Sequence, residues 1–278
     1  RRAAGRLRAV LARLGVVVAV LGVAGAGIWG LTRAATLEVS PTTLDIPALS
    51  VKPAKVEPGS IVPVSAALKG APEPEKRKQQ QTRSAEDLLA DWANRVSLVA
   101  GIPARALMAY GKAELVTRES NPGCSLSWAT LAGIGRVESY HGQYGGAVLL
   151  ANGRPSIPII GVPLDGSPGV RAISDTDGGR FDGDTRVDRA VGPMQFIPST
   201  WARYAADGNG DGKGDPQQID DAALAAARYL CVGQRDMASA QGWWAGILSY
   251  NRSVEYAQKV FGQADAYAKA AQTVRNQN

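Results

Sequence analysis

The chain has 278 residues, of which 45% are hydrophobic and 20% charged, so it can build a buried core and is not a disordered protein as a whole. Lysine and arginine outnumber aspartate and glutamate by 31 to 25, which gives a net charge of +6. Six arginines that precede the first acidic residue account for this excess: Arg1, Arg2, Arg6, Arg8, Arg13 and Arg33. The rest of the chain is close to neutral, which argues against a nucleic-acid-binding domain.

An uncharged apolar stretch follows the first arginines. Residues 14–31 carry no charge, and their length matches the roughly 18 to 20 residues that a helix needs to cross a bilayer core. We therefore expect a transmembrane helix over 14–32. Five arginines precede the stretch and one follows it, which predicts a cytoplasmic basic segment over 1–13 and an extracytoplasmic position for the remainder. A cleaved secretory signal is the alternative, and it would export the same part of the chain.

Residues 33–83 are predicted to form an extracytoplasmic linker. Seven prolines are spread over this stretch: Pro41, Pro47, Pro53, Pro58, Pro63, Pro72 and Pro74. Prolines at this density favour extended, unpacked backbone, so the segment would hold an outer domain away from the membrane.

Helical patterns dominate from Ser84 onward. Ser84 is a candidate N-cap, because two acidic residues, Glu86 and Asp87, follow in the first turn. Further helices are expected over 104–116, 127–138, 199–206, 219–231, 243–251 and 254–273. The stretch 142–187 is rich in glycine, proline and aspartate, and it predicts a long loop or a small β insertion. The fold class is therefore mainly α.

Glu138 lies on the apolar face of one of these helices. Leu131, Ile134 and Glu138 follow one another at spacings of three and four, so their side chains project from the same face. Gly142 ends the helix soon afterwards, and both the helix C-terminus and apolar burial raise the pKa of a carboxyl group. Such a residue suits general acid catalysis. A structural ion pair with Arg136 explains the same position equally well.

An aspartate-rich segment, 207–218, has the spacing of an EF-hand calcium loop. Oxygen ligands occupy positions 1, 3, 5 and 9, a glycine occupies position 6, and the backbone carbonyl of Lys213 occupies position 7: Asp207, Asn209, Asp211, Asp215 and Gly212. Position 12 is Gln218 instead of the usual glutamate, so Asp220 or Asp221 must replace it or the site is weak. A metal-free turn is the alternative.

The chain contains two cysteines and one histidine, and each limits the chemistry. Cys124 and Cys231 are expected to pair if the domain is exported, although two buried thiols would also fit. Because His141 is the only histidine, a catalytic or metal site with several histidines is excluded. We expect His141 at the surface, at a helix end.

Three segments in this order resemble the motifs of the lytic murein transglycosylases: Glu138-Ser139, Gly192-Pro193-Met194-Gln195, and Tyr250-Asn251 with Tyr256 nearby. The resemblance is closest to the membrane-bound B-type branch in its actinobacterial form, and it covers roughly residues 85–265. It implies a lysozyme-like (goose-type or transglycosylase) helical domain over 84–278.

The resemblance also implies a reaction and a partner. Glu138 would be the sole catalytic acid/base, Met194 and Gln195 would form part of the sugar-binding floor, and Tyr250 with Asn251 would contact the glycan near the cleavage point. The substrate would be the peptidoglycan glycan strand, cleaved between N-acetylmuramic acid and N-acetylglucosamine with 1,6-anhydro ends, in cell-wall remodelling. No cofactor is implied for catalysis, and a comparable loop in the B-type branch implies a structural Ca²⁺.

One departure from the family leaves alternatives open. Family members often carry a serine shortly before the Gly-x-Met-Gln segment, whereas 184–191 contains none and offers only Thr185. Several aspartates crowd the same region: Asp175, Asp177, Asp182, Asp184 and Asp188. A hydrolytic muramidase with one of them as second carboxylate is therefore the runner-up, and an inert wall-binding scaffold is the third hypothesis.

Overall fold

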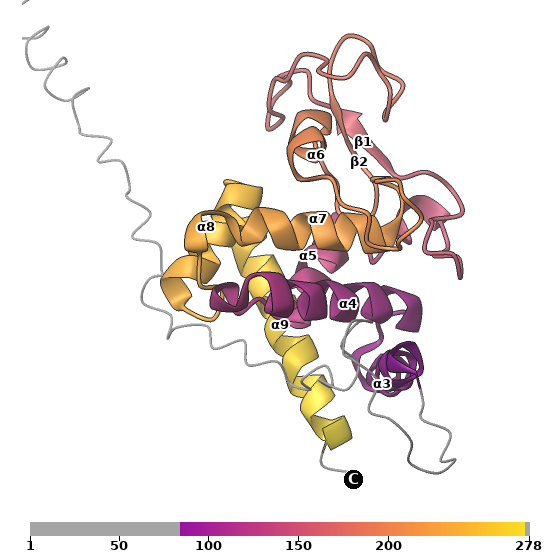
Figure 1. The fold of residues 1–278 in the computed structure, drawn as a ribbon. Coiled ribbons are helices and arrows are strands. Elements are labelled where there is room, and N and C mark those ends of the chain that lie inside the picture. The colour runs from indigo at the N-terminus through magenta and orange to yellow at the C-terminus, as the bar shows by residue number, and fades with distance from the viewer. Residues whose placement is uncertain (1–83, 276–278) are drawn as a thin grey trace, which may run out of the picture. The chain divides into compact units, whose positions relative to one another are not determined.

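The computed structural model describes residues 84–275, which form a helical domain (Figure 1). The basic segment expected over 1–13, the transmembrane helix over 14–32 and the linker over 33–83 lie outside the described residues. Within 84–275, every helix is too short or too polar to span a bilayer.

Two helices joined by a tight turn open the domain. α3 (Ala85–Ala100) starts at the predicted cap: the Ser84 hydroxyl accepts the Asp87 backbone N–H at 3.0 Å, and the Asp87 carboxylate accepts the Ser84 N–H at 3.1 Å. This reciprocal capping satisfies backbone donors that the first turn leaves without a partner. Gly101 ends α3 in the left-handed conformation, and α4 (Ala104–Ser120) begins directly after Pro103.

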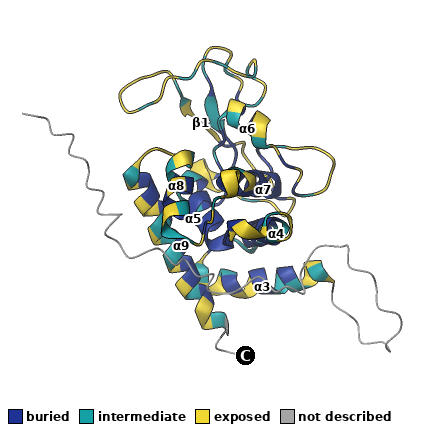
Figure 2. Ribbon diagram, turned by 60° about the vertical axis from the view of Figure 1, so that its left-hand side comes forward, coloured by how far each residue is buried: buried dark blue, intermediate teal, exposed yellow. Residues whose placement is uncertain are grey.

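α5 (Trp128–Ser139) is the central helix, with Ser127 as its N-cap as predicted. It packs against α4 and against α9 (Val254–Arg275), and it is buried over most of its length (Figure 2). Glycine is required at two positions, because a Cβ on Gly133 would lie 2.7 Å from the Val260 carbonyl oxygen and one on Gly135 would lie 2.1 Å from the Tyr110 hydroxyl. The predicted apolar face therefore extends almost around the helix.

The remaining helices join this centre mainly through α7 and α9. They are α6 (Pro198–Tyr204), α7 (Ile219–Leu230) and α8 (Ala240–Tyr250), with short 3₁₀ turns at η2 (Pro122–Cys124), η3 (Tyr144–Gly146) and η4 (Val232–Gln234). α7 packs against α4, and α8 against α9. The bounds agree with the expected helices to within a few residues, although α8 begins three residues before the expected 243.

The segment between α5 and α6 forms a small β insertion. β1 (Ile160–Pro163) and β2 (Arg189–Val191) pair antiparallel, with Ile160 opposite Val191 and Pro163 opposite Arg189. Isolated bridges link the segments between the two strands, at Asp165 with Ala172 and at Ser174 with Val187. Together with α6, the insertion forms a lobe on the α7 side of the helices, away from α3 (Figure 1). The mainly α class with a small β insertion is thus confirmed.

Cys124 and Cys231 form a disulfide. Their Cα atoms lie 5.5 Å apart and the bond spans 107 positions of sequence. It joins η2 to the end of α7. The predicted pairing is confirmed, and the alternative of two free thiols is wrong.

Candidate active site

Glu138 lies in the last turn of α5, half-buried, and bonds to a tyrosine from the start of α9. The Tyr256 hydroxyl donates a 2.5 Å hydrogen bond to Oε1 of Glu138, and Tyr256 is itself buried, with 8% of its surface exposed. Arg136, the alternative ion-pair partner, instead places its guanidinium 4.3 Å from the centre of the Tyr140 ring. The ion pairs found among residues 84–275 do not include Glu138.

Burial controls the protonation of Glu138. Desolvation raises the pKa of its carboxyl group to about 7, and the hydrogen bond from Tyr256 acts in the opposite direction by stabilising the carboxylate. The carboxyl group thus exchanges its proton near neutral pH, as an acid that also acts as a base must.

Ser139 fastens the end of α5 to the Gly-x-Met-Gln segment. Its buried hydroxyl donates to the Pro193 carbonyl oxygen at 2.6 Å and accepts the Gly142 backbone N–H at 2.8 Å. One side chain therefore fixes both the turn after Glu138 and the position of residues 192–195.

The turn after Ser139 is left-handed at two successive residues that are not glycine. Tyr140 has φ 54° and His141 φ 63°, conformations that cost about 1–3 kcal/mol each and persist where the surrounding structure fixes them. The turn directs His141 inward, where Nδ1 lies 3.2 Å from the Tyr110 hydroxyl and Nε2 lies 3.1 Å from the Tyr267 hydroxyl. The expectation of a surface histidine is wrong, since His141 is only 1% exposed. Burial, followed by the charge of Arg136, lowers its pKa to about 3, so it stays neutral.

Tyr250 contacts the backbone of Met194, and Gln195 follows Met194 in the chain. The Tyr250 hydroxyl donates to the Met194 carbonyl oxygen at 2.7 Å, whereas the Met194 side chain is fully buried. Gln195 is half-buried with φ 47°, and its Nε2 donates to the Gly192 carbonyl oxygen at 3.0 Å. Burial, and then the negative charge of Glu138, raise the pKa of Tyr250, so these two residues are close enough to interact.

The predicted site is therefore brought together in part. Glu138, Tyr250 and the backbone of Met194 are linked through the contacts above, while Asn251 ends α8 in an exposed position and accepts the Ser253 backbone N–H at 3.1 Å. Tyr256 has no role predicted from the sequence, although it stands only six positions after Tyr250, in the first turn of the next helix. Only the folded chain shows that it reaches Glu138.

The five aspartates of the insertion hold their own loop. Asp175 and Asp177 accept backbone N–H groups from residues 177–181, Asp182 accepts those of Asp184 and Arg189, and Asp188 binds Thr176. Asp184 pairs with the Arg189 guanidinium at 3.1 Å. Thr185 is exposed and lines a cavity of this insertion that does not include Glu138.

Hydrogen bonds within the segment hold the first half of the calcium-like loop. The Asp207 carboxylate accepts the N–H groups of Gly210, Asp211 and Gly212, and Asp211 accepts that of Lys213. Carboxylate and amide oxygens of Asp207, Asn209 and Asp211 suit a hard cation such as Ca²⁺. Their donor chemistry therefore suits the ion, while the carboxylates of Asp207 and Asp211 already accept hydrogen bonds within the loop.

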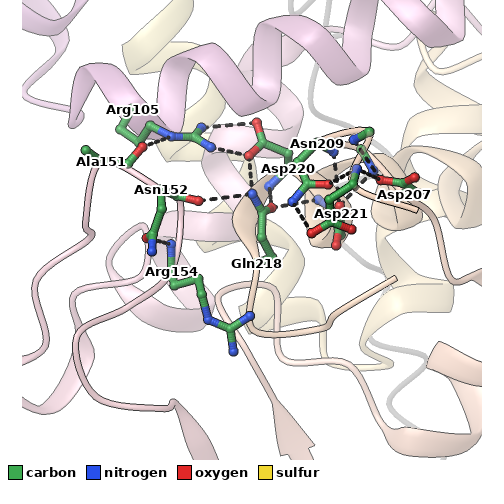
Figure 3. Close-up of polar contacts among 12 residues, drawn as sticks. Arg105, Ala151, Asn152, Arg154, Asp207, Asn209, Gln218, Asp220 and Asp221 are labelled. Carbon is green, nitrogen blue, oxygen red and sulfur yellow. Dashed lines mark hydrogen bonds and ion pairs between the residues drawn. The ribbon is translucent and has the colours of Figure 1, made fainter. Parts of the chain in front are cut away.

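The second half of the loop makes other contacts (Figure 3). Asp215 pairs with Arg154, and Gln218 caps α7 by accepting the N–H groups of Asp220 and Asp221. Asp220 pairs with Arg105. The buried carboxylate of Asp221 accepts three N–H groups of the loop, those of Gly208, Asn209 and Asp215. The ligands expected at positions 9 and 12 thus have protein partners, and the calcium site stays a prediction.

The end of the loop, residues 216–217, also contacts the Gly-x-Met-Gln segment and the residue before β1. A Cβ on Gly192 would lie 1.7 Å from the Pro216 carbonyl oxygen, so only glycine allows this approach. The buried Gln217 side chain accepts the Ile159 N–H at 3.0 Å and donates to the Ile159 carbonyl oxygen at 2.9 Å. Residues 216–217 therefore fix the positions of the Gly192 turn and of Ile159, the residue before β1.

A tighter group of carboxylates lies elsewhere. Within the described range, the group of three whose oxygens lie within 4.8 Å of one another consists of Asp175, Asp177 and Asp188. The sequence predicts a cation at 207–218 instead. Asp175 and Asp177 accept backbone N–H groups of their own loop.

Comparison with known proteins adds one match. Residues 187–247 match a family model described as the Transglycosylase SLT domain. The match covers less than half of the chain; it includes the Gly-x-Met-Gln segment and the calcium-like loop and begins after Glu138. No curated protein and no solved structure matches the chain. The match supports a transglycosylase-type domain, and the mainly helical architecture is consistent with a lysozyme-like fold.

Proposed function

We propose that this protein is a peptidoglycan lytic transglycosylase of the membrane-bound B-type. It would cleave the β-1,4 bond between N-acetylmuramic acid and N-acetylglucosamine and leave 1,6-anhydro ends, in cell-wall remodelling. One observation carries the proposal: a half-buried Glu138 with a pKa of about 7 is tied by Ser139 to a segment inside the transglycosylase match.

Glu138 performs both proton transfers in this proposal. In its protonated form it donates to the glycosidic oxygen as that bond breaks and the muramic acid C1 gains oxocarbenium character. As a carboxylate it then accepts the proton of the C6 hydroxyl group, whose oxygen bonds to C1 and closes the anhydro ring. The carboxyl group is protonated again at the end, and no water is consumed. The hydrogen bond from Tyr256 to Oε1 holds the carboxyl group in place throughout.

Sugar contacts are assigned to the residues around Glu138. The Gln195 amide both donates and accepts hydrogen bonds, as N-acetyl and hydroxyl groups require, and Tyr250 and Asn251 lie toward the cleavage point. Met194 contributes through its backbone, since its carbonyl oxygen orients the Tyr250 hydroxyl while its side chain is buried.

Hydrolysis by the same domain is the competing function. It needs a second carboxylate that activates water, but the candidate aspartates accept hydrogen bonds within the insertion. Mass spectrometry of the products separates the two reactions, because an anhydro end is one water lighter than a reducing end. Reducing ends alone would refute the transglycosylase mechanism. A folded protein that releases no product, with Glu138→Gln behaving identically, would favour the inert scaffold.

The topology and the metal belong to the same proposal. The apolar stretch 14–32 would be a single-pass anchor that places the domain outside the membrane, where the Cys124–Cys231 disulfide persists. A Ca²⁺ ion on the first half of the 207–218 loop would be structural.

A further inference from the structure

His141 is a buried titratable residue that the proposed mechanism does not use. It follows Glu138 by three positions, in the left-handed turn after α5, and 1% of its surface is exposed. Its Nδ1 lies 3.2 Å from the Tyr110 hydroxyl, and its Nε2 lies 3.1 Å from the Tyr267 hydroxyl. A neutral imidazole donates through one ring nitrogen and accepts through the other, so both nitrogens have a partner. The ring therefore links α4 and α9 to the turn that follows Glu138.

Two tyrosines of α9 bond to this part of the chain from one face of that helix. Tyr256 donates to Glu138, and Tyr267 contacts His141. The tyrosines stand eleven positions apart, which is about three helical turns and about 16 Å along the axis of α9. Two contacts this far apart fix both the distance and the angle between α9 and the end of α5, whereas a single contact leaves the angle free.

Tyr110 adds a third contact, from α4. Its hydroxyl lies against the backbone of α5, because a Cβ on Gly135 would be 2.1 Å from that hydroxyl and 3.5 Å from Nδ1 of His141. The carbonyl oxygen of Gly135, three positions before Glu138, accepts the His141 backbone N–H at 2.9 Å. The side chain and the backbone of His141 thus both hold the last turn of α5.

The contacts of His141 act through geometry and not through charge. Burial, and then the charge of Arg136, lowers the pKa of His141 to about 3, so the ring is neutral where Glu138 titrates. Replacement of His141 by another neutral residue therefore leaves the charge of Arg136 and of the nearby tyrosines as it was. Burial raises the pKa of each of these tyrosines, which are Tyr110, Tyr250, Tyr256 and Tyr267.

We propose that His141 is a positioning residue for Glu138. By joining Tyr110 to Tyr267, it holds the end of α5 at the distance and angle that align the Tyr256 hydroxyl with the carboxyl group. The inference rests on the proposed function, in which Glu138 is the catalytic acid. Left-handed residues other than glycine persist only where the surrounding structure fixes them, so the turn relaxes when the contacts of His141 are removed. The bond from Tyr256 then loses its alignment and stabilises the carboxylate less.

The test measures the pKa of Glu138 from the pH dependence of the NMR signal of its side-chain carboxyl carbon, which requires no catalysis. His141→Phe keeps a buried ring and removes both side-chain contacts, and Tyr267→Phe removes one hydroxyl group. In each variant the pKa of Glu138 should rise by about 0.5, and by less than in Tyr256→Phe. The alkaline limb of kcat/KM should move to higher pH with it.

Thr130→Val is the matched control for a merely structural effect. Thr130 lies on α5, is 1% exposed and accepts the Trp243 indole N–H at 3.1 Å, so this variant also loses a buried hydrogen bond. Thr130 lies eight positions before Glu138, about 12 Å along the helix, so the pKa of Glu138 should keep its wild-type value.

A double variant tests whether His141 acts through the bond from Tyr256. When His141→Phe is added to Tyr256→Phe, the pKa of Glu138 should show no further rise, because that bond is already absent.

The outcomes separate this inference from the proposed function. The positioning role is overturned by an unchanged or lower pKa of Glu138 in folded His141→Phe, by an equal rise in Thr130→Val, or by a further rise in the double variant. Each of these results leaves the transglycosylase intact. If His141→Phe does not fold, Tyr267→Phe decides by the same criteria. If wild type releases no product while the pKa values follow the expected pattern, the proposed function is refuted and the positioning role stands.

Discussion

The Tyr256 hydroxyl donates a 2.5 Å hydrogen bond to Oε1 of Glu138 across 118 positions of sequence. The bond joins the last turn of α5 to the first turn of α9, two helices that pack against each other in the core. It stabilises the carboxylate, whereas burial stabilises the protonated acid, and burial is the larger effect.

The first prediction concerns the pH dependence of cleavage. Among the groups around Glu138, burial raises the pKa values of Tyr250 and Tyr256 far above neutrality, and the pKa of His141 is about 3, so the alkaline limb near pH 7 belongs to Glu138. Tyr256→Phe removes a bond that lowers the pKa of Glu138, so the alkaline limb of kcat/KM should move to higher pH. The pH–rate profiles of wild type and variant measure this shift.

Tyr204→Phe is the matched control for that shift. Its ring packs against Tyr229 with centroids 5.0 Å apart, whereas the hydrogen bond to Glu138 comes from Tyr256, so its profile should equal that of wild type. An alkaline limb that stays in place in Tyr256→Phe would contradict the role of the hydrogen bond.

The second prediction concerns stability in Glu138→Gln. The folded pKa of Glu138 is raised from 4.5 to about 7, so its stabilising contribution is complete below pH 4.5 and is lost as the pH rises through 7. Between pH 4 and pH 8, the free energy of unfolding of wild type should therefore fall relative to the variant by about 2 to 3 kcal/mol. Denaturant titrations at both pH values measure the difference, and parallel curves would refute the raised pKa. Cleavage by the variant should drop by a factor of about 100 or more.

The third prediction concerns the anchor of the catalytic turn. Ser139→Ala removes the partner of two groups, the Pro193 carbonyl oxygen and the Gly142 N–H. It should cost about 2–4 kcal/mol of unfolding free energy, since each buried group without a partner costs about 1–3 kcal/mol. Thermal unfolding checks this against Ser120→Ala, whose exposed hydroxyl donates only to the Val116 carbonyl oxygen and whose loss should change stability by under about 0.5 kcal/mol. Equal effects of the two substitutions would contradict the anchoring role.

The fourth prediction concerns the disulfide. The bond spans 107 positions, and in the chain-entropy model a loop of this length contributes about 4 to 5 kcal/mol. Reduction should lower the melting temperature of wild type, while a Cys124→Ser/Cys231→Ser variant should melt at that lower temperature with or without reductant. A reductant effect on the variant would point to a cause other than this bond.

The fifth prediction concerns calcium. If the loop binds Ca²⁺ with the Kd of about 0.1–1 mM typical of extracellular sites, 10 mM Ca²⁺ should stabilise the fold by about 1.4–2.7 kcal/mol. Asp207→Ala should abolish this increment whatever its effect on the starting stability, whereas Asp236→Ala, in an exposed loop before α8, should retain it. A melting temperature that does not respond to Ca²⁺ would exclude the site.

Sequence periodicity predicted most of the fold, because helix caps and apolar faces are local signals. Ser84 and Ser127 cap the helices they were expected to cap, and Glu138 lies on the helix that was assigned to it. The contacts between residues of the candidate site could not be predicted from the sequence in the same way. Tyr256 reaches Glu138 only through the packing of α9 on α5, and no spacing along the chain encodes that approach.

Two local features also escaped sequence reasoning. His141 has polar neighbours in sequence, yet two left-handed residues turn it into the core between Tyr110 and Tyr267. Gln218 occupies a metal-ligand position by count, but the start of α7 needs its oxygen as a cap. In both cases, the position or role of the side chain depends on partners that a local sequence pattern does not reveal.

The disulfide divides the candidate site topologically. Residues 124–231 form a covalently closed ring that contains Glu138, Ser139 and the Gly192–Gln195 segment. Tyr250 and Tyr256 stand on the linear tail beyond Cys231. The Glu138 carboxyl group and the Tyr256 hydroxyl group thus belong to separate topological parts of one chain. The site is complete only when α8 and α9 pack against the ring.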